Sequence, residues 1–150
     1  MRRRRIEVSA TTVASPSAVY ALLVEGTTWP DWSPIESFAL ERPGVGAPAG
    51  VGAIRVFRRG RTTGRDQVLE LVSDRRLRYA SLSGLPVRDY VGEVELEPAP
   101  GGTDIRWQSS FLPAVRGTGW LVERGIRRFL TGCVHGLAEY AADHRDASAA

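Results

Sequence analysis

The sequence predicts an α+β domain in which one long helix covers a seven-stranded antiparallel sheet. Apolar and polar residues alternate in seven segments between residues 4 and 112, and an amphipathic helical pattern follows them. Short segments rich in glycine, proline or charge separate the last six of these segments. Because parallel neighbours need a crossover of about a dozen residues or more, short connections indicate antiparallel pairing. We expect residues 1–150 to form a single domain with flexible ends, 1–4 and 145–150.

The first strand and two short helices open the chain. Every second residue of the segment 4–12 is apolar over most of its length, which is typical of a half-buried strand. Ser15 then caps a short helix, since its hydroxyl can accept a free backbone N–H at the helix start. Pro16 takes the first helical position, where a missing N–H costs nothing. A second short helical turn is predicted within 28–33.

Six further strands and a long helix complete the fold. The strands are predicted over 35–42, 51–59, 62–73, 76–83, 89–98 and 103–112, and the helix over 118–144. The apolar stripe of the helix contains Val122, Ile126, Phe129, Cys133, Leu137 and Tyr140, opposite Arg124, Thr131, His135 and Ala138. Gly125, Gly132 and Gly136 form one line at the edge of this stripe, although each costs a helix about 1 kcal/mol relative to alanine. Either the helix packs tightly there, or the glycines shape a cavity.

Composition excludes several classes of protein. Hydrophobic residues make up 43% and charged residues 25%, as in globular domains. The single cysteine, Cys133, excludes an internal disulfide, and no apolar run reaches the length of a membrane span. The basic start lacks the apolar segment of a signal peptide, so we expect a soluble cytoplasmic protein. We expect a monomer or a homodimer.

Charge does not indicate a nucleic-acid partner. All 20 basic residues are arginine, the net charge is +3, and the pI is about 9.6. The arginines are scattered among the chain start, probable turns and the polar side of the helix, with no aromatic stacking motif beside them.

Strand alternation assigns an inward face to each predicted strand. On 62–73, Leu69 and Gln67 are expected inside and Asp66 outside. Polar side chains on an inner face cost several kcal/mol if unpaired, so a group of them favours a cavity over a solid core. A backbone group or buried water is the alternative partner for each. The predicted ligand-contacting residues are Gln67, Leu69, Tyr79, Ser81, Tyr90, Val94, Trp107, Ser109, Phe111, Ile126, Phe129 and Cys133.

Few residues offer catalytic chemistry. Arg55 has apolar neighbours on both faces of its strand, so it points either inward, where it could hold a ligand carboxylate, or outward into water, the default expectation. Tyr79 and Tyr90 could donate protons. Neither His135 nor His144 has metal-ligand spacing to another ligand residue, and nucleotide-binding motifs are lacking. We therefore expect no metal and no cofactor, and a core role for Cys133.

The order of elements resembles the helix-grip fold of the START-like (SRPBCC, Bet v 1-type) superfamily, in particular its bacterial polyketide cyclase/dehydrase-like branch. The resemblance spans about residues 4–145. The segments that carry it are Ala14-Ser15-Pro16-Ser17-Ala18-Val19-Tyr20, Trp29-Pro30-Asp31-Trp32-Ser33-Pro34, Asp74-Arg75-Arg76-Leu77-Arg78-Tyr79, Tyr90-Val91-Gly92-Glu93-Val94 and Gly102-Thr103-Asp104-Ile105-Arg106-Trp107. It implies a curved sheet that grips the C-terminal helix around an elongated apolar cavity, with a ligand-closing loop at 83–87.

Three functions are compatible with this sequence. The resemblance favours binding of a small hydrophobic ligand, such as a polyketide, a lipid or an aromatic metabolite, in the cavity. The enzymatic alternative is a polyketide cyclase, aromatase or dehydratase that uses Tyr79, Tyr90 and Arg55. The third alternative is a protein-interaction module with a docking site on the exposed sheet or on Trp29 and Trp32, although these tryptophans more often pack as lids over a sheet edge.

Overall fold

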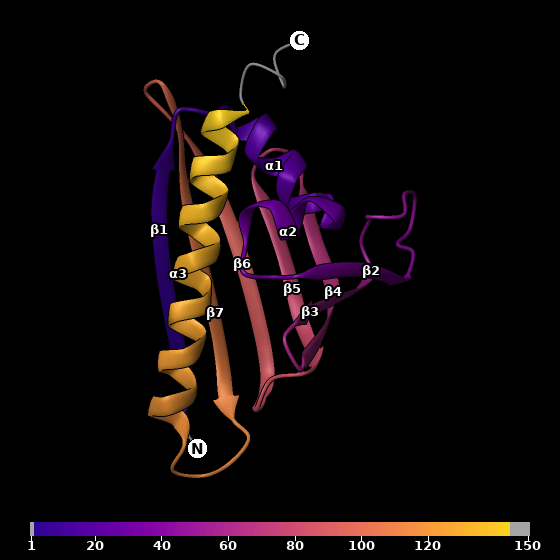
Figure 1. The fold of residues 1–150 in the computed structure, drawn as a ribbon, viewed down its shortest axis with the longest axis vertical. Coiled ribbons are helices and arrows are strands. Elements are labelled where there is room, and N and C mark those ends of the chain that lie inside the picture. Colours follow the sequence, from indigo (N-terminus) through magenta and orange to yellow (C-terminus); the bar gives the residue numbers. More distant parts are fainter. Residues whose placement is uncertain (1, 145–150) are drawn as a thin grey trace.

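The computed structural model describes residues 2–144, so the predicted flexible tail 145–150 and Met1 lie outside the described residues (Figure 1). Within them, seven strands form one antiparallel sheet in the order β1-β7-β6-β5-β4-β3-β2. The strands are β1 (Arg4–Thr12), β2 (Ser37–Arg42), β3 (Ile54–Arg59), β4 (Thr62–Val72), β5 (Arg76–Ser83), β6 (Val87–Ala99) and β7 (Gly102–Pro113). The helices are α1 (Pro16–Val24), the 3₁₀ turn η1 (Gly26–Thr28), α2 (Trp29–Trp32) and α3 (Gly119–Asp143). The predicted α+β helix-grip fold is confirmed.

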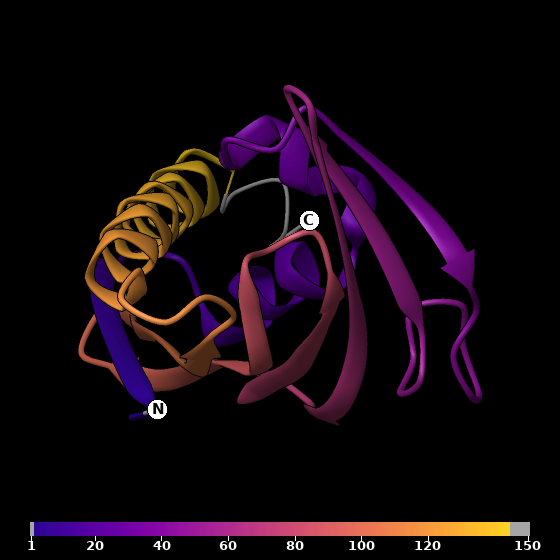
Figure 2. The same ribbon diagram turned by 90° about the horizontal axis from the view of Figure 1, so that it is seen from below.

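The sheet curves around α3, which lies along its concave side over β1 and β7 (Figures 1 and 2). Strands β2 to β7 follow one another as a meander, and β1 joins the far edge by pairing with β7. The short helices lie over the other part of the concave face. None of the helices within residues 2–144 is long and apolar enough to cross a membrane.

Local sequence signals explain where α1 begins. The Ser15 hydroxyl accepts a hydrogen bond from the Ala18 backbone N–H at 3.2 Å, and Pro16 is the first helical residue. Both features were predicted. The cap satisfies one of the backbone donors that a helix leaves unpaired at its start.

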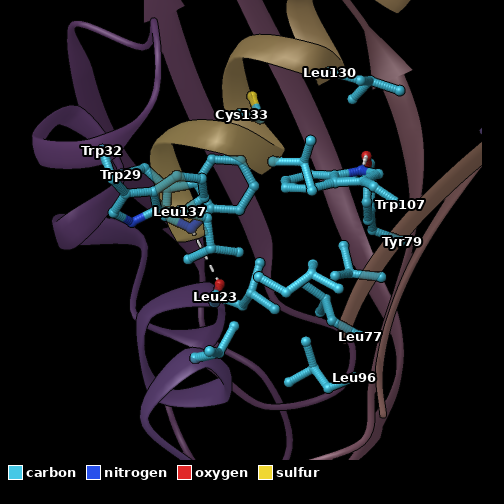
Figure 3. Close-up of a cluster of buried hydrophobic side chains, with 14 of the residues drawn as sticks. Leu23, Trp29, Trp32, Leu77, Tyr79, Leu96, Trp107, Leu130, Cys133 and Leu137 are labelled. Atoms are coloured by element: carbon cyan, nitrogen blue, oxygen red, sulfur yellow. Dashed lines mark hydrogen bonds between the residues drawn. The ribbon is translucent and has the colours of Figure 1, made fainter. Parts of the chain in front are cut away.

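The two tryptophans of α2 are part of the hydrophobic core. Trp29 is 4% exposed and Trp32 is 5% exposed, and their rings lie 4.6 Å apart. The Trp29 indole N–H donates to the Leu23 carbonyl at 3.1 Å (Figure 3), and the Trp32 indole N–H donates to the Thr28 hydroxyl. Both rings also contact Trp107 of β7. The segment therefore acts as a lid over the sheet, and the alternative of an exposed docking site on these tryptophans is wrong.

The inward faces of β5, β6 and β7 are as predicted. Their buried side chains are Leu77 and Tyr79, then Tyr90, Val94 and Leu96, then Ile105, Trp107, Ser109 and Phe111. Apart from Ser109, these residues belong to one hydrophobic core together with the inner face of α3, and Figure 3 shows part of this core.

The inward face of β4 is not as predicted. Asp66 and Val68 are buried, whereas Leu69 is 40% exposed and Gln67 reaches the backbone carbonyl of Gly52 at 3.4 Å. The β4–β5 register shifts between Val68 and Glu70, so Leu69 is an extra residue in β4. A bulge of this kind interrupts the alternation that strand patterns rely on. The placement of Gln67 and Leu69 on the inner face is therefore wrong.

The buried face of α3 is wider than its predicted stripe. Leu130, Val134 and Ala141 are buried, and so is Ala138, which had been assigned to the polar half. The Ala138 carbonyl accepts a hydrogen bond from the buried Thr12 hydroxyl at 2.8 Å, which ties α3 to the end of β1.

The three helical glycines serve two purposes. A Cβ at Gly136 would collide with the Trp32 carbonyl oxygen, and one at Gly132 would press on Pro34 at 3.3 Å. These two glycines let the helix approach the α2 segment closely. A Cβ at Gly125 would meet nothing within 4 Å, because this glycine faces the hollow described next.

Candidate functional site

A cavity of about 530 Å³ lies between the first half of α3 and the concave face of the sheet. Buried aromatic residues form its inner wall, chiefly Trp29, Phe57, Tyr79, Tyr90 and Trp107. Ile126, Phe129 and Leu130 of α3 form the opposite wall. The first half of α3 therefore contacts β1 on one side, through Arg4 and Glu123, and leaves the cavity between its inner face and the strands opposite.

Six of the predicted contact residues line this cavity. They are Tyr79, Ser81, Tyr90, Trp107, Ile126 and Phe129. Val94, Ser109, Phe111 and Cys133 are buried in the surrounding core and do not line it. Gln67 and Leu69 lie outside the lining for the reason given above.

Arg55 and Asp66 form a buried ion pair beside the cavity. They are direct partners across β3 and β4, and both side chains point inward. Arg55 Nε lies 2.8 Å from Asp66 Oδ1, and Arg55 Nη2 lies 3.0 Å from Oδ2, a two-point geometry that strengthens such pairs. The expected outward orientation of Arg55 is therefore wrong, since its side chain is only 2% exposed.

Aromatic rings and a backbone carbonyl complete the surroundings of Arg55. Its guanidinium carbon lies 5.2 Å from the Trp29 ring centre and 5.0 Å from that of Phe57, close enough for cation–π attraction. Arg55 Nη1 approaches the Leu23 carbonyl at 3.5 Å. Because Arg55 Nε and Nη2 both donate to the Asp66 carboxylate, they hold that carboxylate in place and are not available to a ligand carboxylate. Asp66, not Arg55, lines the cavity.

Tyr79 is a buried hydrogen-bonded phenol at the cavity wall. The Trp107 indole N–H donates to the Tyr79 hydroxyl oxygen at 3.0 Å. Burial raises the pKa of Tyr79 well above its ordinary value, the nearby Tyr90 and the Asp66 carboxylate add to the rise, and the Trp107 hydrogen bond opposes it. Tyr79 is therefore a neutral hydrogen-bond donor at physiological pH.

Tyr90 places a second phenol next to the first. Its ring lies 6.3 Å from that of Tyr79 and stacks on Phe111. Burial raises the pKa of Tyr90 in spite of the nearby Ser109 and Tyr79 hydroxyls, which lower it. Ser109 Oγ is buried and meets no partner with hydrogen-bond geometry among the described residues. The inner end of the cavity therefore combines a carboxylate with two protonated phenols.

Neither Cys133 nor a cluster of metal-ligating side chains within residues 2–144 contributes to this cavity. Burial raises the pKa of the Cys133 thiol strongly, so this residue stays protonated and acts as core. Within residues 2–144, no three His, Cys, Asp or Glu side chains gather as a metal site. A wider groove beside β1 and the β6–β7 turn is lined by exposed polar residues such as Glu97, Asp104 and His135 together with small apolar residues, and none of the aromatic side chains of the cavity lines it.

The cavity opens to the surface where several turns meet the start of α3. Its exposed lining residues include Arg59 and Thr62 on either side of the β3–β4 turn, Leu85 and Pro86 of the β5–β6 turn, and Leu121. The predicted loop 83–87 therefore borders the opening. Gly84 adopts φ +100°, and a Cβ there would collide with the Thr63 carbonyl oxygen, so glycine is needed for this turn to pack on β4. Whether the loop closes over a ligand stays a prediction.

Sequence alternation alone missed Asp66, although the β3–β4 turn contains a signal that locates it. Arg59 and Thr62 are partners on either side of a two-residue turn at Gly60 and Arg61. Counting outward from this closing pair brings Arg55 opposite Asp66. A β3–β4 register derived from this turn would have predicted that Arg55 and Asp66 are neighbours.

Comparison with known proteins supports the same fold. The sequence profile of the family described as polyketide cyclase / dehydrase and lipid transport matches residues 3–142. No curated protein sequence matches the chain.

Solved structures of low sequence identity share this fold. The Zhui aromatase/cyclase from Streptomyces sp. R1128 has a TM-score of 0.77 and 16% identity, covering 95% of this chain and 96% of its own. A START superfamily protein from Mycobacterium smegmatis has a TM-score of 0.79 and 10% identity, covering 93% and 97%. Ara h 8.0201 has a TM-score of 0.75 and 16% identity, covering 95% and 99%. These structures share the fold, and the profile match over residues 3–142 shows that the chain belongs to the polyketide cyclase / dehydrase and lipid transport family.

Proposed function

We propose that the protein binds one small hydrophobic molecule, a polyketide, a lipid or an aromatic metabolite, between α3 and the sheet. The observation that carries this proposal is the aromatic cavity of about 530 Å³ with a few polar groups at its inner end. Pockets for small molecules have volumes of roughly 300–1,000 Å³ and the same division between apolar walls and a few orienting polar groups.

The polar groups favour a ligand with a hydroxyl or keto group at its inner end. Asp66 accepts hydrogen bonds, while Tyr90 donates one as a protonated phenol. A ligand carboxylate would face the Asp66 carboxylate, whose arginine partner is already bound. We therefore expect neutral ligands to bind more tightly than their carboxylate analogues.

Thermal unfolding in the presence of candidate ligands tests the binding proposal. A ligand at one hundred times its dissociation constant stabilises the native state by about 2.7 kcal/mol. For a chain of this size, that corresponds to a rise in Tm of roughly 5–11 °C. A broad apolar library that gives no shift and displaces no bound dye would refute the proposal.

A cavity-filling variant makes the test specific. A Cβ at Gly64 would meet only the Phe57 carbonyl oxygen, at 3.8 Å, and Gly64 lines the cavity. Gly64→Phe is therefore expected to remove the ligand-induced shift. Leu69→Phe, on the exposed face of the same strand, is the matched control and should keep the shift.

The Asp66 carboxylate supports a second candidate function, cyclisation or dehydration of a linear poly-β-ketone. The carboxylate could take a proton from a methylene group between two ketones, and the resulting enolate carbon would attack another ketone carbon of the chain. A neighbouring phenol, Tyr90, would give its proton to the new alkoxide. In the dehydration, Asp66 would give its proton to the departing hydroxyl, and the Tyr90 phenolate would take the second α-proton, so that water leaves, a carbon–carbon double bond forms and both residues return to their starting states.

Turnover of a poly-β-ketone surrogate decides between binding and catalysis. Tyr90→Phe is expected to abolish turnover while apolar dyes still bind, because this change removes only the hydroxyl. A product distribution that is the same with and without the protein would reject the enzymatic function and leave ligand binding intact.

A further inference from the structure

Exposed apolar side chains gather at the open end of the cavity. Trp120 is 61% exposed, Val115 59%, Leu121 57% and Leu85 39%. They lie on the first turn of α3, on the β7–α3 loop and on the β5–β6 turn, and we call these four residues the mouth rim. The loop and the turn are joined by a hydrogen bond from the Ala114 N–H to the Pro86 carbonyl at 3.0 Å. Clustered apolar exposure of this kind marks an interaction surface.

Arginines surround the mouth rim. They include Arg59 at the end of β3, Arg61 in the β3–β4 turn, Arg88 at the start of β6, Arg116 in the β7–α3 loop, and Arg2 and Arg3 beside β1. Arg2 and Arg3 share a surface hollow with Gly117 and Gly119 at the start of α3. Figure 2 looks onto this end of the molecule.

Few carboxylates balance these arginines. Glu123 is close to Arg4, at 3.6 Å, and Glu36 accepts a hydrogen bond from the Gly60 N–H. Asp89 also lies near this end, and its backbone carbonyl accepts a hydrogen bond from Arg3. Six exposed arginines therefore stand against these three carboxylates, so this end carries a positive excess comparable with the net charge of +3 of the whole chain.

We propose that the mouth rim docks onto a membrane surface rich in anionic lipid. Trp120 and Leu121 would enter the headgroup region, and the surrounding arginines would contact lipid phosphates. Exposed aromatic and aliphatic residues combined with basic ones bind membrane interfaces in this way, each arginine near the surface contributing about 1 kcal/mol.

This inference concerns the surface around the cavity opening and so goes beyond the proposed function. Its consequence for that function is direct, because Leu85 and Leu121 belong both to the mouth rim and to the cavity lining. A docked protein would turn the cavity opening toward the bilayer, so an apolar molecule could enter without crossing water. An acidic protein would match the charges, but it would not require the apolar rim to converge on the opening.

Co-sedimentation with vesicles tests the proposal. Ligand-free protein is expected to sediment with equimolar phosphatidylcholine and phosphatidylglycerol, and not with phosphatidylcholine alone. Salt at about 1 M should release it, because the screening length falls to about 3 Å. Since the vesicles carry no candidate ligand, this outcome is independent of whether the cavity binds one.

Matched variants locate the binding surface. Arg61→Gln/Arg116→Gln is expected to weaken vesicle binding about 25-fold, about fivefold for each arginine. Arg75→Gln/Arg78→Gln removes the same charge away from the rim and should change binding less than twofold. Trp120→Ser should also weaken binding, whereas Val13→Ser, an exposed apolar residue in the β1–α1 connection, should not. Absence of vesicle binding, as expected of a surface for an acidic protein, or equal effects of rim and control variants, would overturn the proposal.

Discussion

Breaking the Arg55–Asp66 pair from one side should strongly destabilise the protein. Arg55→Met leaves the Asp66 carboxylate without its two-point partner, in a site where its side chain is only 12% exposed. Asp66→Leu likewise leaves the Arg55 guanidinium, 2% exposed, without its counter-charge. Removing one partner of a buried pair costs about 3–5 kcal/mol, because the remaining charge stays desolvated.

The double variant Arg55→Met/Asp66→Leu should recover most of this loss. Replacing both charges by apolar groups is often neutral or stabilising, since the desolvation cost disappears together with the attraction. Urea denaturation of the four proteins gives the coupling free energy directly. At about 2–4 °C per kcal/mol, each single variant should lower Tm by roughly 6–20 °C.

A coupling free energy near zero would refute this reasoning. In that case the two single losses would add in the double variant, and each side chain would be stabilised by something other than its partner. The aromatic rings around Arg55 would then be the main source of its stability.

Two further predictions follow from the glycines of α3 and from the buried phenols. Gly125→Ala is expected to raise the free energy of unfolding by up to about 1 kcal/mol, and Gly136→Ala to lower it by about 1–3 kcal/mol, because only the Cβ at position 136 would meet backbone atoms. Urea denaturation measures both changes, and equal effects of the two variants would contradict the assigned packing. Because burial raises the folded-state pKa values of Tyr79 and Tyr90, the unfolded chain loses its phenol protons first as pH rises above about 10. The free energy of unfolding should therefore fall above that pH. Ultraviolet absorbance should show that these phenols ionise only when the protein unfolds, and their ionisation in the folded protein near pH 10 would contradict their burial.

Much of the fold could be predicted because hydrophobic alternation and turn residues are strong local signals. The alternation is regular over Leu77 to Tyr79 of β5, Tyr90 to Leu96 of β6 and Ile105 to Phe111 of β7, so Tyr79, Tyr90 and Trp107 were assigned correctly. The helix start at Ser15 and Pro16 was predicted because capping depends on neighbouring residues alone.

The wrong predictions concern residues whose orientation depends on contacts with residues distant in the sequence. The bulge at Leu69 changes which residues of β4 face inward, and its position depends on pairing with β5 rather than on the residues of β4 alone. Arg55 was expected in water because a lone arginine prefers water, and only the opposing Asp66 makes burial acceptable. The glycine row packs against α2 at one end and faces the cavity at the other, which the helical pattern alone could not distinguish.

A methyl-resolved NMR titration with an apolar ligand tests the central claim most directly. Ile126 and Leu130 line the cavity, and Leu69 lies exposed on the other side of the sheet. We expect saturable shifts at the Ile126 and Leu130 methyl groups with one ligand bound per chain, while the Leu69 methyls stay unchanged. Shifts confined to exposed methyl groups such as those of Val115 and Leu69, with Ile126 and Leu130 unaffected at saturation, would contradict a ligand site between α3 and the sheet.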